Sequence, residues 1–347
     1  MAATATLPTL KPDDFKTDQE VRWCPGCGDY SILAQMKKAL ATVGVPREKM
    51  AFISGIGCSS RFPYYMNTYG FHTIHGRAPT FATGLRLANP DIQVWVVTGD
   101  GDGLSIGGNH LIHALRRNVD IKVLLFNNEI YGLTKGQYSP ASRPGTPSKT
   151  SPGGSFETPV RPLSIALAAE ATFVARTIDI DVQHLVSVLQ KAAAHRGSAF
   201  VEIYQNCKIF NDAVFEYATD KSVKSNNILY LEHGKPMVFG KDRNRGIRLN
   251  GLKPEVVEIG KDCSLDDVLT HDETCEEPTL AYLLSRFAHD AVKDPVKPFP
   301  EPVGVLRNVR RPTYEELLDT RINEAIAKKG KGKIEELFKA EDVWTVE

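Results

Sequence analysis

The stretch IQVWVVTGDGDG, residues 92–103, decides the fold, because a short apolar run rich in β-branched residues enters a loop of glycine and aspartate. Runs of the same kind occur at Met50–Ser54, Ile121–Phe126 and Ala199–Tyr204. Short strands that are almost fully apolar are buried on both faces, which is typical of a parallel sheet covered by helices on either side. The sequence therefore predicts a doubly wound α/β fold with a mostly parallel sheet.

Segments with helical spacing of apolar residues separate these strands. One of these segments ends at about Asn118, and two others cover Leu163–Glu170 and Val182–His195. A further helix is predicted at Thr313–Lys329. Ser139–Arg161 is rich in proline, glycine, serine and threonine, which predicts a long loop. Loops of this length inside a compact domain are often binding elements.

The overall composition is that of an ordinary soluble protein. The 347 residues include 42 basic and 42 acidic side chains, and 42% are hydrophobic. Without a basic excess, neither nucleic acid nor an anionic membrane is an expected partner. The N-terminal MAATATLPTL lacks the cationic flank and apolar core of a signal peptide, and no apolar run reaches the length of about 18 residues that a membrane span requires. We expect a cytoplasmic protein.

The distribution of charge divides the chain near residue 220. Residues 1–220 contain 40 of the 84 charged side chains and the much shorter remainder contains 44. We predict a cofactor-binding domain over residues 1–220 and a charged C-terminal extension over residues 221–347, either peripheral or packed on a partner. Within this extension, only the helix at Thr313–Lys329 shows a firm period.

Two polar motifs follow neighbouring predicted strands. Asp100 lies in the glycine-rich loop after the first strand, and Asn127-Asn128 follows the next one. Carboxylate and amide oxygens suit Mg²⁺, which prefers few protein ligands together with phosphate oxygens. Glycines let backbone amides approach a diphosphate. The loop does not have the Gly-x-Gly-x-x-Gly spacing of a dinucleotide site, which disfavours NAD.

Four cysteines lie in three loops that the predicted sheet brings to one edge. Cys24 and Cys27 form a Cys-x-x-Cys pair in a turn, whereas Cys58 and Cys207 each follow a strand. Three alternatives remain from the residues alone: a lone pair with two packing cysteines, a zinc site, or a four-iron cluster that accepts widely separated ligands. The other two cysteines, in an acidic segment without a partner motif, are interpreted as ordinary residues.

These motifs together resemble one family. The motifs are WCPGCG at 23–28, GIGCSS at 55–60, HGR at 75–77, TGDGD at 98–102 and NNEIYGLTKGQ at 127–137, followed by Cys207. Gly-Asp-Gly followed some 25 residues later by Asn-Asn resembles the thiamine diphosphate motif. The whole stretch is similar to the β subunits of 2-oxoacid:ferredoxin oxidoreductases, and the segment NTYGFHTIHGR at 67–77 looks most like the members specific for 2-oxoglutarate.

The resemblance implies roles for individual residues. The four cysteines Cys24, Cys27, Cys58 and Cys207 would bind a [4Fe-4S] cluster. Asp100, the Asn128 side chain and the Ile130 carbonyl would bind Mg²⁺. The residues implied around the diphosphate are Gly101, Asp102, Gly132 and Leu133, and those implied around the thiazolium side are Ile56, Gly57, Ser59 and His75.

Two of these roles have an ordinary structural alternative. His75 could equally be a hydrogen-bonded loop residue. Lys135 is a candidate contact for the anionic substrate or coenzyme A, with a solvated surface lysine as the alternative.

The resemblance also implies an activity: thiamine diphosphate-dependent and coenzyme A-dependent oxidative decarboxylation of 2-oxoglutarate to succinyl-CoA and CO₂, reversible, with electrons passing through the cluster to ferredoxin. Thiamine enzymes need a glutamate from a second α/β module, and residues 221–347 show no sign of one. We therefore expect a separate α subunit in an αβ or α2β2 assembly. The alternatives are the same chemistry on pyruvate or a branched-chain 2-oxoacid, a thiamine-dependent lyase without redox chemistry, and a non-catalytic iron-sulfur or zinc module.

Overall fold

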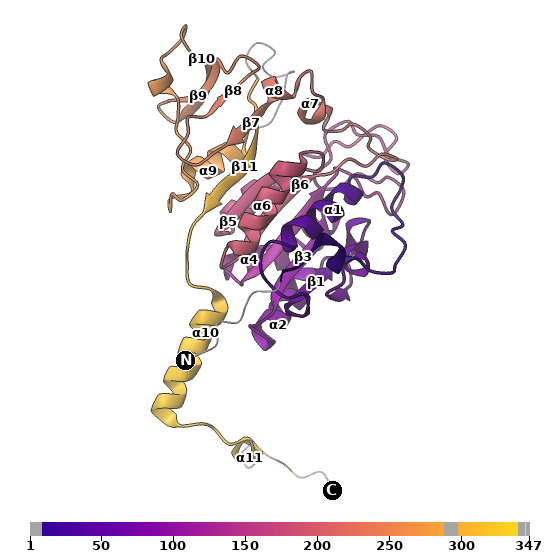
Figure 1. Cartoon of the computed structure of the whole chain (residues 1–347), viewed down its shortest axis with the longest axis vertical. Coiled ribbons are helices and arrows are strands. Elements are labelled where there is room, and N and C mark those ends of the chain that lie inside the picture. The colour runs from indigo at the N-terminus through magenta and orange to yellow at the C-terminus, as the bar shows by residue number, and fades with distance from the viewer. Residues whose placement is uncertain (1–8, 288–297, 339–343, 345–347) are drawn as a thin grey trace.

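The computed structural model describes residues 9–287, 298–338 and Trp344. Its centre is an eight-stranded sheet in the order β2-β1-β3-β4-β6-β5-β11-β7 (Figure 1). The first six strands in that order run parallel, β11 pairs antiparallel with β5, and β7 is parallel to β11. The strands are β1 (Met50–Ser54), β2 (Tyr69–His72), β3 (Gln93–Gly99), β4 (Ile121–Asn127), β5 (Phe173–Ile178), β6 (Ala199–Tyr204), β7 (Ile228–Leu231) and β11 (Glu301–Asn308).

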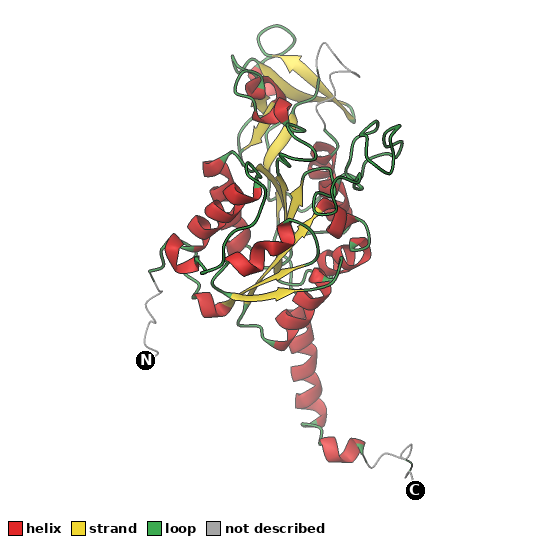
Figure 2. Cartoon of the chain, turned by 90° about the vertical axis from the view of Figure 1, so that its right-hand side faces the viewer, coloured by secondary structure: helices red, strands yellow, loops and turns green. Residues whose placement is uncertain are grey.

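Helices cover both faces of this sheet, as Figure 2 shows. The central strands send alternate side chains to the two faces: Ile53 and Val96 join one apolar cluster, while Phe52 and Trp95 join the other. The helices are α1 (Asp29–Leu40), α2 (Ala78–Ala88), α3 (Asp100–Leu104), α4 (Gly108–Arg116), α5 (Pro162–Ala168), α6 (Val182–Ala194), α7 (Glu216–Thr219), α8 (Lys224–Asn227), α9 (Thr279–Ser285), α10 (Tyr314–Lys329) and α11 (Ile334–Leu337). Four short 3-10 helices lie at Pro12–Phe15, Arg47–Lys49, Ser59–Tyr65 and Leu265–Asp267.

The predicted doubly wound sheet is confirmed, and the four predicted strands correspond to β1, β3, β4 and β6. The predicted helices correspond to α4, α5, α6 and α10. Ser139–Arg161 contains no helix or strand, as expected for a loop. Within the described part of the chain, no helix is long and apolar enough to span a membrane.

The chain beyond residue 220 contains more structure than its sequence predicts. Besides β7 and β11, it forms a separate antiparallel sheet from β8 (Val238–Phe239), β9 (Arg245–Asn250) and β10 (Lys253–Glu258), which lies at the top of Figure 1. The expectation that only one helix would be regular there is therefore wrong. The division into two parts at residue 220 stays a prediction. Helix α10 projects away from the body of the molecule (Figures 1 and 2).

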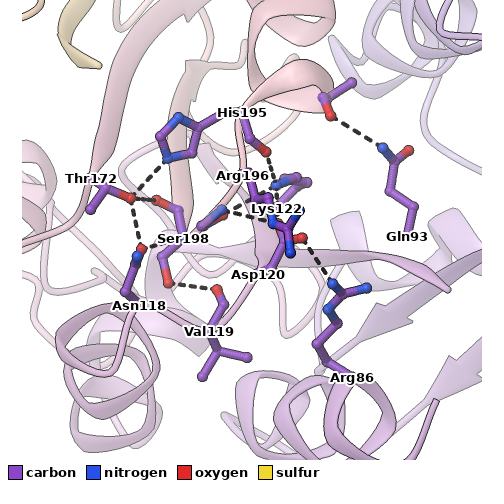
Figure 3. A network of polar contacts seen from close by, with 12 residues as sticks. Arg86, Gln93, Asn118, Val119, Asp120, Lys122, Thr172, His195, Arg196 and Ser198 are labelled. Carbon is purple, nitrogen blue, oxygen red and sulfur yellow. Dashed lines mark hydrogen bonds and ion pairs between the residues drawn. The ribbon is translucent and has the colours of Figure 1, made fainter. Parts of the chain in front are cut away.

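A dense polar network occupies the edge where β4, β5 and β6 begin (Figure 3). The Asn118 side chain accepts hydrogen bonds from Thr172 Oγ1 at 2.7 Å and from the Ser198 amide at 2.9 Å. Buried Lys122 donates from Nζ to Asp120 Oδ1 at 2.5 Å and to the carbonyls of residues 195 and 197. This network ties together the loops at the edge opposite the cofactor motifs.

Candidate active site

The functional motifs meet at the edge where the parallel strands end. The loop after β1 carries Cys58, helix α3 after β3 begins with Asp100, the turn after β4 carries Asn128, and the loop after β6 carries Cys207. These strands are neighbours in the sheet, so loops that are far apart in the chain converge. The edge formed by the carboxyl ends of parallel strands is the usual ligand site of such sheets.

One cavity at this edge has a volume of about 500 Å³. The eleven residues implied around thiamine diphosphate and its Mg²⁺ all line it, together with the predicted cluster ligand Cys58: Ile56, Gly57, Ser59, His75, Asp100, Gly101, Asp102, Asn128, Ile130, Gly132 and Leu133. The sequence reasoning did not identify several other lining residues, among them Tyr131, Thr134, Gln137 and Gln205. The volume lies within the range of small-molecule sites.

Asp100 is a buried carboxyl at the wall of this cavity, with 2% of its surface exposed. Burial raises the pKa of Asp100 to about 7, although Ser139 and backbone amides donate hydrogen bonds to it. A buried carboxylate of this kind is stabilised by a cation. The position and chemistry of Asp100 therefore fit a Mg²⁺ ligand.

Asp102 has a different environment and joins three parts of the site. Its Oδ1 accepts hydrogen bonds from the amides of Ile56 at 3.0 Å and Gly76 at 2.7 Å, and lies 2.7 Å from Nδ1 of His75. Its Oδ2 accepts from Thr98 Oγ1 at 2.6 Å. Asp102 thus holds the loops around residues 56 and 76 against α3, and the predicted site residue His75 is a hydrogen-bonded loop residue as well.

At two positions of this site, a neighbouring side chain lies so close to the backbone that only glycine fits. A Cβ atom at Gly101 would lie 2.2 Å from the ring of Tyr131, and one at Gly55 would lie 2.0 Å from the Asp102 carboxylate. The Tyr131 hydroxyl donates to the carbonyl of Gly101 at 2.9 Å. These contacts leave no space for a side chain, so the glycines allow α3 to pack against the loops after β1 and β4.

The Asn127-Asn128 turn is fixed by its own side chains. The Glu129 amide donates to Asn127 Oδ1 at 3.2 Å, and the Ile130 amide donates to Asn128 Oδ1 at 3.1 Å. Glu129 has a φ of +55°, a conformation that few non-glycine residues adopt. The turn places the Asn128 side chain at the cavity wall, where its oxygen is available as a metal ligand.

A second cavity of about 240 Å³ lies beside the first, and all four predicted ligands Cys24, Cys27, Cys58 and Cys207 line it. The Trp23 indole donates from Nε1 to the carbonyl of Cys58 at 2.7 Å, which joins two of the three cysteine loops. None of the cysteines described by the structure is in a disulfide. The other two, Cys263 and Cys275, do not line this cavity.

The surroundings of two of these thiols, Cys27 and Cys58, favour the protonated form. Burial, followed by the charge of Asp29, raises the pKa of Cys27 well above its ordinary value and that of Cys58 to about 12. Bound metal deprotonates a coordinating thiol. In the described part of the chain, no three His, Cys, Asp or Glu side chains converge as ligands of a single ion. Four sulfurs around a cavity fit a polynuclear iron-sulfur cluster.

The two cavities share a wall. Five residues line both of them: Cys58, Asn128, Gly132, Leu133 and Gln205. A Cβ atom at Gly132 would lie 3.5 Å from the sulfurs of both Cys58 and Cys207. Lys135 lines the cysteine cavity and not the larger one, together with the cations Arg22, Arg61 and Lys208. The sequence offered one signal for Gln205, namely a polar residue directly after a buried strand.

Comparisons with known proteins agree with this geometry. Residues 55–203 match the family model described as "Thiamine pyrophosphate enzyme, C-terminal TPP binding domain". The chain is 50% identical to the 2-oxoglutarate oxidoreductase subunit KorB of Mycobacterium tuberculosis, over 100% of this chain and 92% of the relative. It is 35% identical to the 2-oxoacid:ferredoxin oxidoreductase subunit beta of Saccharolobus solfataricus, over 83% of this chain and 96% of the relative.

A solved structure is similar over nearly the whole length. It is 2-oxoglutarate:ferredoxin oxidoreductase from Magnetococcus marinus with 2-oxoglutarate, coenzyme A and succinyl-CoA bound, and it aligns with a TM-score of 0.74 and 33% identity over 97% of this chain and 98% of that chain. Sequence, fold and the arrangement of the motifs agree over the whole chain. The chain therefore belongs to the β subunits of the 2-oxoacid:ferredoxin oxidoreductases.

Proposed function

We propose that this chain is the β subunit of an enzyme that oxidatively decarboxylates 2-oxoglutarate to succinyl-CoA and CO₂, reversibly, and passes the electrons to ferredoxin. The observation that carries the proposal is the shared wall: a cavity lined by the thiamine diphosphate motif adjoins a cavity lined by four cysteines. An oxidative decarboxylation by single electrons needs these two centres close together. The names of the relatives support the choice of 2-oxoglutarate.

In this proposal, thiamine diphosphate supplies the carbon nucleophile and the electron sink for decarboxylation when bound. The chain's own residues bind and orient it. Asp100, the Asn128 side chain and the Ile130 carbonyl hold Mg²⁺. The residues proposed around the diphosphate are Gly101, Asp102, Gly132 and Leu133, and those proposed around the thiazolium ring are Ile56, Gly57, Ser59 and His75.

Cys24, Cys27, Cys58 and Cys207 hold a [4Fe-4S] cluster in this proposal. Its electrons go to an acidic acceptor such as ferredoxin, and four cations around the cysteine cavity support that choice. Arg61 and Lys135 form no ion pair among the described residues, whereas Lys208 pairs with Asp212 at 2.6 Å. Lys135 is exposed at the rim, a position from which it can contact an anionic substrate or coenzyme A arriving from solvent.

An α subunit is the proposed source of the missing glutamate, and an exposed apolar surface supports its binding. Strand β2 is an edge strand whose residues are all exposed, with Tyr69 and Phe71 at 57% and 45%. Phe71 also lines an apolar groove with Ile53, Phe81 and Leu85. Exposed apolar patches on edge strands mark interaction surfaces.

The test uses the complex of this chain with its α subunit, purified without oxygen. We expect coenzyme A-dependent reduction of ferredoxin or a viologen dye, fastest with 2-oxoglutarate among 2-oxoglutarate, pyruvate and 2-oxoisovalerate. The β chain alone is expected to be inactive. The matched control is Cys263→Ser, which changes a cysteine outside the cavity and should keep about four irons per chain, whereas Cys58→Ser should not.

The outcomes separate the alternatives. Preference for pyruvate or 2-oxoisovalerate would keep the reaction and replace the substrate. Activity without bound iron would favour a lyase. Bound iron with no acceptor reduction by any of the three acids would contradict the enzymatic function and favour a non-catalytic iron-sulfur module.

A further inference from the structure

Gln205 is the first residue after β6 and belongs to the wall between the two cavities. Only 1% of its surface is exposed, and its backbone amide donates to the carbonyl of Asn127 at 2.9 Å. A buried carboxamide has two donors and one acceptor group that need partners. Among the partners of Gln205, Asn128 lines both cavities and Cys27 lines the cysteine cavity.

The two ends of the side chain face different centres. Oε1 accepts a hydrogen bond from Asn128 Nδ2 at 2.7 Å. Nε2 donates to Cys27 Sγ at 3.3 Å and to the carbonyl of Asn206 at 2.5 Å. The Asn206 carbonyl accepts only, so it fixes which end of the Gln205 amide carries the nitrogen.

The contact with Asn128 determines the orientation of that side chain as well. Because Asn128 Nδ2 donates to Gln205, the other atom, Oδ1, faces the Ile130 amide and the cavity. Oxygen is the atom that Mg²⁺ accepts as a ligand. Hydrogen bonds from the surroundings of a ligand commonly set its orientation and the affinity for the metal.

The contact with Cys27 acts on the sulfur. An N–H group that donates to a cluster sulfur stabilises added negative charge, so it raises the reduction potential of the cluster. Loss of that donor, or its replacement by a carboxylate, lowers the potential. One side chain therefore touches a ligand of each centre.

We propose that Gln205 is a positioning residue for both centres: it orients Asn128 toward Mg²⁺ and, through its hydrogen bond to Cys27, raises the potential of the adjoining cluster. This inference rests on the proposed function, because it takes Cys27 and Asn128 as ligands. It assigns a role to a residue outside the thiamine and cysteine motifs.

Two substitutions distinguish the contact of Gln205 with Asn128 from its contact with Cys27. Gln205→Glu keeps an acceptor for Asn128 but removes the donor to Cys27, so we expect a lower cluster potential with unchanged Mg²⁺-dependent binding of thiamine diphosphate. Gln205→Met removes both contacts, so both should change. The expected shift of the one-electron reduction equilibrium is about tenfold, or about 59 mV, and the expected loss of cofactor affinity in Gln205→Met is about tenfold.

The measurements are a redox titration of the cluster followed by electron paramagnetic resonance and a calorimetric titration of the anaerobic complex with thiamine diphosphate and Mg²⁺. The control is Gln190→Glu on α6, where the side chain donates to Thr42 Oγ1 at 2.8 Å and lines neither cavity. This control makes the same chemical change and should leave both readouts at the wild-type value.

Wild-type potential and affinity in a folded, iron-loaded Gln205→Met variant would overturn the inference. If that variant does not fold, an unchanged potential in Gln205→Glu overturns it instead. A wild-type complex that binds neither iron nor thiamine diphosphate would overturn the proposed function itself, an outcome that the variants cannot mimic.

Discussion

Polar side chains lie at both ends of the parallel strands of the main sheet, but their surroundings differ between the two ends. Where β4 and β5 begin, Lys122 and Asn118 each have several partners from this chain (Figure 3). Where the strands end, Asp100 has a pKa raised to about 7, and four cysteines line a cavity. A buried polar group costs free energy unless it is partnered.

This difference indicates which end of the strands binds a ligand. At the edge where the strands begin, side chains and carbonyls of this chain provide the hydrogen-bond partners of Lys122 and Asn118. These contacts therefore stabilise the fold. At the other edge, carboxyl and amide oxygens and four cysteine sulfurs line two cavities, and the buried Ser59 hydroxyl has no hydrogen-bond partner among the described residues. Substitutions at the first edge should therefore change folding stability, and substitutions at the second should change ligand binding.

The largest effect is expected for Lys122→Met at the first edge. The substitution removes one of the two cations that pair with Asp120, which keeps Arg86 at 3.1 Å, and takes the donor away from the carbonyls of residues 195 and 197. Because each buried acceptor left without a donor is costly, the free energy of unfolding should fall by about 3–5 kcal/mol, as measured by urea denaturation. Lys38→Met is the control, because Lys38 is exposed and has no ion pair among the described residues. A loss of cofactor affinity in folded Lys122→Met without a loss of stability would contradict the contrast between the edges.

The second effect is a pH dependence of stability at the same edge. Burial, followed by the charge of Lys122, lowers the pKa of His195 to about 4, from about 6.5 in the unfolded chain. Between these two values only the unfolded state binds the proton, so stability falls as the pH decreases, by about 3 kcal/mol in total. At pH 7 the contribution is absent.

His195→Gln tests this contribution by comparison with the wild type across pH 7 to 4. The variant should lose less stability over this range, since other titrating groups are common to both proteins. Parallel stability curves for the two proteins would show that His195 does not carry the effect.

The third effect belongs to the cofactor edge. Asp100→Asn keeps the shape of the side chain and removes a buried charge, so the folded state should not be destabilised. The affinity for thiamine diphosphate with Mg²⁺ should fall by about 100-fold, as measured by calorimetry. Destabilisation comparable to that of Lys122→Met, with cofactor binding intact, would reverse the assignment of the two edges.

The smallest effect is expected where α10 joins the first edge. Thr313 caps this helix by accepting from the Glu316 amide at 3.3 Å, and the neighbouring Pro312 carbonyl accepts from Asn118 Nδ2 at 3.1 Å. Thr313→Ala should cost about 1 kcal/mol in thermal or urea denaturation, while Thr313→Ser should restore most of it. Equal stability of all three proteins would show that the cap contributes nothing.

The sequence predicted the central strands from their mostly apolar runs, although β4 contains Lys122 and β6 contains Glu202, and it did not predict β5, in which Arg176 is the charged residue. That arginine is buried, and its Nε donates to Glu202 Oε2 on β6 at 2.8 Å. It also contacts Glu301 at the start of β11. A charged residue in a strand is compatible with burial only when distant partners neutralise it, and a local pattern contains no information about them.

The same limit applies to the site. Asp100, Asn128 and the four cysteines were identifiable because spacing and residue type carry their chemistry. Gln205 was not, because its contacts with Asn128 and Cys27 join segments that are 77 and 178 positions apart in the chain. The glutamate Glu202 likewise accepts from Asn127 Nδ2 at 2.8 Å and thereby supports the turn after β4.

Local patterns in the sequence were enough to predict the parallel sheet and to locate the cofactor motifs, because apolar runs and glycine-rich turns act over short distances. Only the tertiary structure decided that β7 and β11 from the charged part of the chain extend the sheet, and that the two cavities share a wall. These features depend on contacts between segments far apart in the chain, whose energies arise only after the strands have been brought side by side.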